Sequence, residues 1–260
     1  MDMNDARYWD GLADYRKLAH DFTVFYAQRA WELADLPHGA TVLDIAAGAG
    51  ALALTAAHAG AKVLATDFSR GMIEAVLSHR LPNLEAKVMD GQALDLPDEA
   101  FDAAFSMFGI MLFADWRKGL REMARVVRSG GIGSVGSWKE PTGAAGNILL
   151  AQHLSRLFPD IVNPVTIEGM NEFRQPERFV AAMMEAGFGD VSIVEVSQDF
   201  MVDGQAFGEP DRLFQFNPVW PLLEPGQRDA IVLSIHGALE SGGGILAVPS
   251  PALIATARRV

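Results

Sequence analysis

The chain contains no cysteine among its 260 residues. This absence excludes disulfide bonds, thiolate metal sites, iron–sulfur clusters and catalysis by a cysteine nucleophile. The remaining chemistry must therefore come from oxygen and nitrogen side chains or from a bound organic cofactor.

Basic residues are also scarce. The chain has 21 Lys and Arg against 33 Asp and Glu, which gives a formal charge of -12 at pH 7. Proteins that bind nucleic acid rely on Lys and Arg to neutralise phosphates, so we expect no nucleic-acid partner. An acidic surface of this kind more often keeps a protein in solution.

Long apolar runs are missing, so the sequence predicts no membrane span. Residues 1–7, MDMNDAR, are polar and lack the basic start and apolar core of a signal peptide. Half of the residues are hydrophobic and 21% are charged, which is typical of a globular protein. We expect a cytoplasmic protein.

Strand and helix patterns alternate from Gly39 onward. Strands are predicted at 41–45, 62–67, 84–88, 101–106 and 131–138, with helices at 50–59, 70–79 and 115–127. Such alternation produces parallel strands with helices on both faces of the sheet. Ligands of these sheets bind at the carboxyl ends of the strands, where Asp44, Asp67, Asp90 and Ser106 fall.

The segment Val42 to Gly50, VLDIAAGAG, is the most informative part of the chain. A strand delivers Asp44 and then breaks into a turn in which Gly48 and Gly50 lack Cβ atoms, so that a ligand can approach the backbone. The following residues, 51–58, are typical of a helix whose first amides point at that ligand. We infer a site for a nucleotide-type cofactor.

Two cofactor classes fit this turn. Gly48, Gly50 and Ala53 satisfy the G-x-G-x-x-G/A pattern of dinucleotide-binding folds, and Asp67 follows in the next strand. The negative charge of Asp44 would repel a pyrophosphate but attract a ligand that carries an ammonium and a sulfonium group. Local charge therefore favours S-adenosylmethionine over NAD or FAD.

The same residues resemble motif I of the class I S-adenosylmethionine-dependent methyltransferases. Further likenesses follow in family order over residues 40–140, at 62–69, 88–93, 94–102 and 125–131. The closest likeness is to the ubiquinone/menaquinone-biosynthesis type, called methyltransferase type 11. Two positions depart from the pattern: Ala46 stands where the first glycine is usual, and Ser129 where proline is common.

The resemblance implies S-adenosylmethionine as cofactor and S-adenosylhomocysteine as product. It implies that Asp67 accepts hydrogen bonds from the ribose hydroxyls and that residues 88–93 contact the adenine amino group. We interpret Phe68 and Met72 as flanking the adenine or, alternatively, as core residues. The expected cofactor-binding residues are Asp44, Ala46, Gly48, Gly50, Asp67, Phe68, Met72, Asp90, Gly91, Gln92, Ser106 and Met107.

The segment 106–113, SMFGIMLF, follows the fourth strand, from which relatives line the methyl-transfer site. Its apolar side chains fit a hydrophobic or aromatic acceptor, and Phe108 and Met111 are the candidates for contact with it. The alternative is that these side chains only pack beneath the next helix.

A general base is needed only for an acceptor that must lose a proton. Tyr15, His20, His153 and His236 lie in segments expected to cap the cleft and are the candidates, each weighed against a purely structural role. Histidine pairs or acidic loops with metal-ligand spacing are absent from the sequence, so we expect no required metal.

The fold class that these patterns predict is a Rossmann-like, doubly wound α/β sheet of seven strands, mostly parallel with an antiparallel last strand. We expect one domain over 1–260: an N-terminal helical cap at 1–38, a cofactor-binding core at 39–140, and C-terminal strands with inserted helices at 141–260. Helices are predicted at 147–158, 176–186, 204–216 and 225–241, and strands at 191–196 and 252–258. The inserted helices would form a substrate lid or the contact of a homodimer.

The preferred function is transfer of a methyl group from S-adenosylmethionine to a small hydrophobic or aromatic acceptor by in-line displacement. One alternative is an NAD(P)-dependent oxidoreductase. Another is a non-catalytic or protein-directed module of the same fold, whose inserted helices would bind a partner.

Overall fold

The computed structural model describes residues 5–10, 13–163, 166–204, 206–214 and 217–260, and the side chains of 13–19 are not described. The chain divides into two compact units. The first comprises Met1–Ser137, Ile167–Val196 and Ala252–Val260, and the second comprises Trp138–Thr166 and Ser197–Pro251. Strands β6 (Phe188–Asp203) and β7 (Ile245–Arg259) contribute residues to both.

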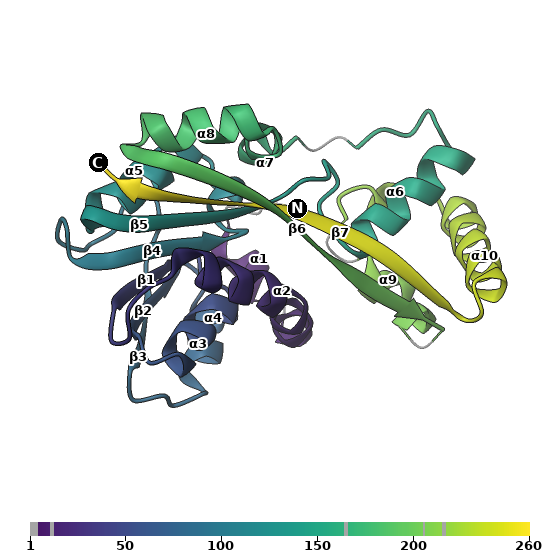
Figure 1. Cartoon of the computed structure of the whole chain (residues 1–260). Coiled ribbons are helices and arrows are strands. Elements are labelled where there is room, and N and C mark those ends of the chain that lie inside the picture. The colour runs from purple at the N-terminus through teal and green to yellow at the C-terminus, as the bar shows by residue number, and fades with distance from the viewer. Residues whose placement is uncertain (1–4, 11–12, 164–165, 205, 215–216) are drawn as a thin grey trace. The chain divides into compact units, whose positions relative to one another are not determined.

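A seven-stranded sheet confirms the predicted fold class, with strand order β3-β2-β1-β4-β5-β7-β6 (Figure 1). It is mostly parallel and ends in antiparallel strands. The five parallel strands are β1 (Thr41–Ile45), β2 (Lys62–Asp67), β3 (Leu84–Val88), β4 (Phe101–Met107) and β5 (Val127–Trp138).

Helices of the first unit form two groups, on opposite sides of the sheet in Figure 1. One group holds α1 (Ala6–Asp10), α2 (Ala13–Ala34), α3 (Ala51–His58) and α4 (Arg70–Leu77). The other holds α5 (Trp116–Val126), α7 (Glu168–Phe173) and α8 (Pro176–Glu185). The buried side chains of α3 are alanines and leucines, and the small alanines allow the helix to pack closely on the neighbouring elements.

The second unit has its own hydrophobic core, which explains why it is compact. It contains α6 (Gly146–Leu157), α9 (Pro210–Leu213) and α10 (Pro225–Ser241). Glu224 and Gln227 form a capping box at the start of α10, whose first residue is Pro225. The core residues come from these helices, the short 3₁₀ turns and connections between them and the adjoining strand segments, and include Leu150, Phe207, Phe214, Trp220, Ile231 and Ile235.

Several predicted elements have different limits in the structure. Strands β6 and β7 are much longer than the predicted 191–196 and 252–258, because they continue through polar residues and prolines that locally indicate a strand end. Strand β5 begins at Val127 rather than at residue 131. Its pairing with β4 shifts register between Phe101 and Ala103, so the strand has additional residues there that have no partner in β4.

The prediction of one helix over 204–216 is wrong. Its described residues form a 3₁₀ turn at Ala206–Gly208 and the four-residue helix α9. Helix α7 was not predicted, because six residues are too few to show a helical period. Among the described residues, no helix is both long and apolar enough to cross a membrane.

A glycine on β5 gives a test of the packing in the first unit. A Cβ atom at Gly133 would lie 2.4 Å from the ring of Phe188, and that ring is only 2% exposed and has little room to move. We expect Gly133→Ala to lower the free energy of unfolding by about 1–3 kcal/mol, measured by urea titration with circular dichroism.

Gly237→Ala is the matched control, since Gly237 lies in α10 with no atom within 4 Å of its added Cβ. It should leave stability unchanged or raise it by up to about 1 kcal/mol. Equal stability of Gly133→Ala and the wild type would contradict this account of the packing.

Candidate functional site

The turns after neighbouring strands meet at the carboxyl edge of the sheet in the first unit. The amide of Ala47 donates to the carbonyl of Thr66 at 2.9 Å, and the amide of Met89 donates to the carbonyl of Asp67 at 2.9 Å. These two bonds join the residues that follow β1 and β3 to the end of β2. The predicted convergence of Asp44, Asp67 and Asp90 at one edge therefore has a backbone explanation.

The small-residue turn after β1 adopts left-handed backbone conformations at Ala46, Gly48 and Gly50, with φ values of 54°, 53° and 87°. A Cβ atom at Gly48 would meet nothing within 4 Å, so the space above this residue is open. A Cβ atom at Gly50 would lie 2.9 Å from Cγ2 of Val76. Gly48 thus leaves room for a ligand, whereas Gly50 allows α3 and α4 to approach.

Asp44 is 2% exposed and lies near the end of β1. Its Oδ2 accepts a hydrogen bond at 3.0 Å from the amide of Ala53, in the first turn of α3. Burial raises the pKa of this carboxyl group to about 8, against the effect of that hydrogen bond, and the charge of Asp67 raises it further. A buried carboxylate with one amide partner favours a positively charged ligand group.

Asp67 is the last residue of β2 and is 6% exposed. Its Oδ2 accepts a hydrogen bond from the amide of Gly48, and its Oδ1 accepts one from the amide of Ser69, both at 2.9 Å. Burial raises the pKa of Asp67, and the charge of Asp10 adds to this effect. Asp67 therefore connects the glycine turn to the start of α4.

Asp10 is a residue of this site that sequence reasoning missed. Its Oδ1 accepts hydrogen bonds from Oγ of Ser69 at 2.6 Å and from the amide of Gly71 at 2.9 Å. The carboxylate of Asp10, the last residue of α1, thus lies at the N-terminus of α4, where negative charge is favourable. The sequence carries no signal for this contact, because 59 residues separate Asp10 from Ser69.

The segment proposed to contact adenine is an ordered turn. Oδ1 of the exposed Asp90 accepts a hydrogen bond from the amide of Gln92 at 2.8 Å. Oε1 of Gln92 accepts one from the amide of Asp115 at 2.8 Å. Gly91 is buried, and a Cβ atom there would lie 2.6 Å from the ring of Phe113. A side chain at this position would require the ring of Phe113 to move.

The two apolar candidates beside this turn differ in exposure. Phe68 is half-buried and retains surface for a ligand. Met72 is 3% exposed, and its amide donates to the capping Oγ of Ser69. Its burial favours the core interpretation of Met72.

The turn after β4 packs directly on the turn after β1. A Cβ atom at Gly109 would lie 2.5 Å from Cβ of Ala46, and Oγ of Ser106 accepts a hydrogen bond from the amide of Ile110. Phe108 has a left-handed φ of 63°, a conformation that non-glycine residues adopt at some cost and often at functional sites. Its ring meets Tyr26 edge to face at 5.3 Å.

The two methionines of this segment have different surroundings. Met107 is half-buried, whereas Met111 is 2% exposed. Oγ of Ser137 donates to Sδ of Met111 at 3.3 Å. Met111 is therefore part of the core, and Phe108, at 9% exposed, is also largely buried.

The candidate bases are in different parts of the chain. His20 of α2 stacks on His79 with ring centroids 6.4 Å apart, and the side chain of Tyr15 lies outside the described residues. His153 and His236 belong to the second unit. Within that unit, His236 packs on Phe207 with ring centroids 4.9 Å apart.

His153 is engaged by polar neighbours in the second unit. Its Nδ1 lies 2.8 Å from Oγ of Ser234, and Arg156 contacts both groups. Burial lowers the pKa of His153, and the charge of Arg156 lowers it further. These contacts account for its burial without a catalytic role. In the part of the chain that the structure describes, no cluster of three or more His, Asp or Glu could hold a metal ion.

The raised pKa of Asp44 predicts a pH-dependent stability. The folded protein keeps the proton up to about pH 8, while the unfolded chain loses it near pH 4. The wild type should therefore lose stability as pH rises from 5 to 8. Asp44→Asn, which keeps an oxygen for the Ala53 amide and does not titrate, should lose less, as measured by urea unfolding at pH 5, 6.5 and 8.

Asp67 affects the pH dependence of stability in the same direction in both proteins. The difference between the two pH profiles therefore reports the contribution of Asp44. Parallel pH profiles for wild type and Asp44→Asn would show that the carboxyl group at position 44 titrates normally.

Known proteins resemble this chain in sequence and in fold. Residues 42–131 match the family model described as "Methyltransferase domain". A demethylmenaquinone methyltransferase of Corynebacterium efficiens is 36% identical over 62% of this chain and 71% of its own. That of Renibacterium salmoninarum is 30% identical over 78% of this chain and 92% of its own.

Solved structures show the fold alone. The YcgJ protein of Bacillus subtilis has a TM-score of 0.58 and 18% identity, and the match covers 91% of this chain and 99% of YcgJ. Phosphoethanolamine N-methyltransferase 2 of Haemonchus contortus, solved with S-adenosylhomocysteine, has a TM-score of 0.53 and 15% identity over 90% of this chain and 52% of its own.

The alternative of an NAD(P)-dependent oxidoreductase is not favoured by these matches. The buried acid near the end of β1, the acid at the end of β2 and the relatives, most of whose length this chain covers, agree on one family. The chain belongs to the class I S-adenosylmethionine-dependent methyltransferases, as an enzyme of the quinone-biosynthesis type.

Proposed function

We propose that this methyltransferase acts on a small aromatic acceptor of the quinone class. The observation that carries the proposal is the match to demethylmenaquinone methyltransferases, which in one case extends over 92% of the relative and so beyond the donor motifs. The described side chains are compatible with such an acceptor. Phe108, in the turn after β4 where relatives line the methyl-transfer site, packs edge to face on the buried ring of Tyr26 in α2.

We further propose roles for the residues at the sheet edge. Gly48 gives the cofactor access to the backbone, and Asp44, on losing its proton in the bound state, offers negative charge to its positively charged groups. Asp67 would accept hydrogen bonds from the ribose hydroxyls, and Asp90 to Gln92 would contact the adenine. The buried polar groups and the open space above Gly48 support this arrangement.

The protein's own contribution is then mainly binding and alignment. S-adenosylmethionine, when bound, supplies an activated methyl group on a good leaving group. The residues of the first unit would fix the cofactor relative to the acceptor and keep water away, which alone lowers the barrier strongly. A general base stays unassigned among Tyr15, His20, His153 and His236.

Asp67 gives a direct test of the donor site. Asp67→Ala should weaken binding of S-adenosylhomocysteine by about 1.5–3 kcal/mol, the usual effect of removing a charge-assisted hydrogen bond. Isothermal titration calorimetry measures the change. Asp229→Ala, at an exposed position of α10, is the control and should bind like the wild type. Unchanged affinity in a folded Asp67→Ala protein would contradict the assignment.

The acceptor is tested by screening. Purified enzyme with S-adenosylmethionine is offered quinones and their reduced forms, simple phenols, thiols and amines, and formation of S-adenosylhomocysteine is measured. We expect turnover with the quinone-type compounds and little with thiols or amines. The reverse order, in a preparation that binds S-adenosylhomocysteine, would refute the quinone proposal and leave the donor site intact.

Other expectations stay predictions. They are the cytoplasmic location, the lack of a nucleic-acid partner, the homodimer, the division into helical cap, core and C-terminal part, and the role of the inserted helices as a substrate lid. A fusion to a fluorescent protein and light scattering of the purified enzyme address the first and the third.

A further inference from the structure

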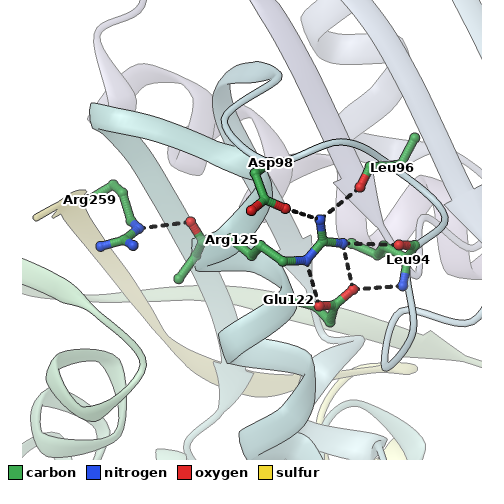
Figure 2. A network of polar contacts seen from close by, with 7 residues as sticks. Leu94, Leu96, Asp98, Glu122, Arg125 and Arg259 are labelled. Carbon is green, nitrogen blue, oxygen red and sulfur yellow. Dashed lines mark hydrogen bonds and ion pairs between the residues drawn. The ribbon is translucent and has the colours of Figure 1, made fainter.

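Helix α5 carries an ion pair, Glu122–Arg125, that also binds the backbone of the connection between β3 and β4. The guanidinium of Arg125 donates two parallel hydrogen bonds to the carboxylate of Glu122, both at 2.8 Å. Its nitrogens also donate to the carbonyls of Leu94 at 2.9 Å and Leu96 at 2.7 Å, and to Oδ1 of Asp98 at 2.7 Å. Figure 2 shows Arg125 at the centre of this network.

Glu122 completes the network from the other side. Its Oε2 accepts a hydrogen bond at 2.8 Å from the amide of Leu94, so both backbone polar groups of Leu94 are held by the pair. The side chains of Arg125 and Glu122 are only 29% and 17% exposed. The ion pair lowers the pKa of Glu122 and raises that of Arg125, so both stay charged over the physiological range. Charge-assisted bonds of this kind are strong and directional.

The backbone held in this way is the connection from β3 to β4, residues 89–100. Of these residues, only Gly91 and Leu94 are buried, so hydrophobic packing gives the connection little support. Further bonds to α5 lie at both ends of the same stretch. Oε1 of Gln92 accepts from the amide of Asp115, and the amide of Glu99 donates to the carbonyl of Arg125 at 2.9 Å.

The connection therefore follows α5 from its N-cap to its last turn. Asp115 caps the start of the helix, and Glu122 and Arg125 lie in its final turns. Leu94, the residue held by both, is two positions after Gln92. Loss of the pair would free the backbone next to the segment Asp90 to Gln92.

We propose that Glu122 and Arg125 are positioning residues for cofactor binding, which fix the segment Asp90 to Gln92 by holding the β3–β4 connection against α5. The inference rests on the proposed contact of this segment with the adenine. A lysine cannot replace Arg125, because a single ammonium group cannot reach the Glu122 carboxylate and two separate carbonyls in a planar fork.

The test compares Arg125→Lys with Arg117→Lys. Arg117 lies on the same helix but pairs with Glu168 of α7 at 2.8 Å. Arg125→Lys should bind S-adenosylhomocysteine about tenfold more weakly, the lower end of the effect of a lost charge-assisted bond. The KM for S-adenosylmethionine should rise with kcat nearly unchanged, and Arg117→Lys should match the wild type.

Hydrogen exchange separates positioning from general stability. In Arg125→Lys, the amides of residues 92–96 should exchange faster while those of β1 and β5 keep their protection. Glu122→Gln retains an oxygen for the Leu94 amide and should show the same local change to a smaller degree. If Arg125→Lys does not fold, the same measurements are made on Glu122→Gln instead.

A double variant asks whether the pair acts through the adenine segment. In an Asp90→Ala background, Arg125→Lys should cause a smaller additional loss of affinity than in the wild type, because the segment is already impaired. Fully additive losses would overturn the inference, as would affinity within twofold of wild type or equally faster exchange throughout the first unit. A wild type that does not bind S-adenosylhomocysteine at all would instead refute the proposed donor site.

Discussion

Burial of two carboxyl groups at the carboxyl edge of the sheet is the constraint on which the site depends. Asp44 and Asp67 are 2% and 6% exposed, and a charged carboxylate in such surroundings requires hydrogen-bond donors. The donors are backbone amides of Ala53, Gly48 and Ser69. These amides come from the glycine turn and from the first residues around α3 and α4, so the two acids determine how strands and helices join.

The same burial defines what the edge can bind. With a pKa of about 8, Asp44 holds a proton at neutral pH in the free protein. A cationic ligand and a proton therefore compete for this carboxyl group. Because Asp67 and Asp10 add negative charge nearby, the edge is suited to a ligand with positive groups and unsuited to a pyrophosphate. This electrostatic preference agrees with the family to which the chain belongs.

Helix α5 has a comparable role for the next strand connection. Its buried face packs in the first unit, and its polar side chains bind the backbone of Leu94 and Leu96. The second unit is organised differently, around its own core of aromatic and aliphatic residues. The proposed donor site thus lies in the first unit, whereas the inserted segments pack around a separate core.

The amino-acid sequence by itself determined the alternation of strands and helices, the glycine turn and the acids at or near the ends of β1 and β2. These features are local: each depends on a hydrophobic period or on neighbouring residues, and the order of the motifs identifies the family. The positions of Asp44, Asp67 and Asp90 along the strands follow from the same local pattern. The first five strands consequently begin or end close to the predicted residues.

Only the tertiary structure decided which residues of each motif are buried in the core and which lie beside open space. Gly50 spaces two helices, Met72 and Met111 are buried, and Asp10 reaches α4 from the N-terminal helix. The tertiary structure also decided the full lengths of β6 and β7 and the hydrogen bonds from Arg125 to the β3–β4 connection. Each depends on contacts between residues far apart in the chain, and a local pattern carries no information about such contacts.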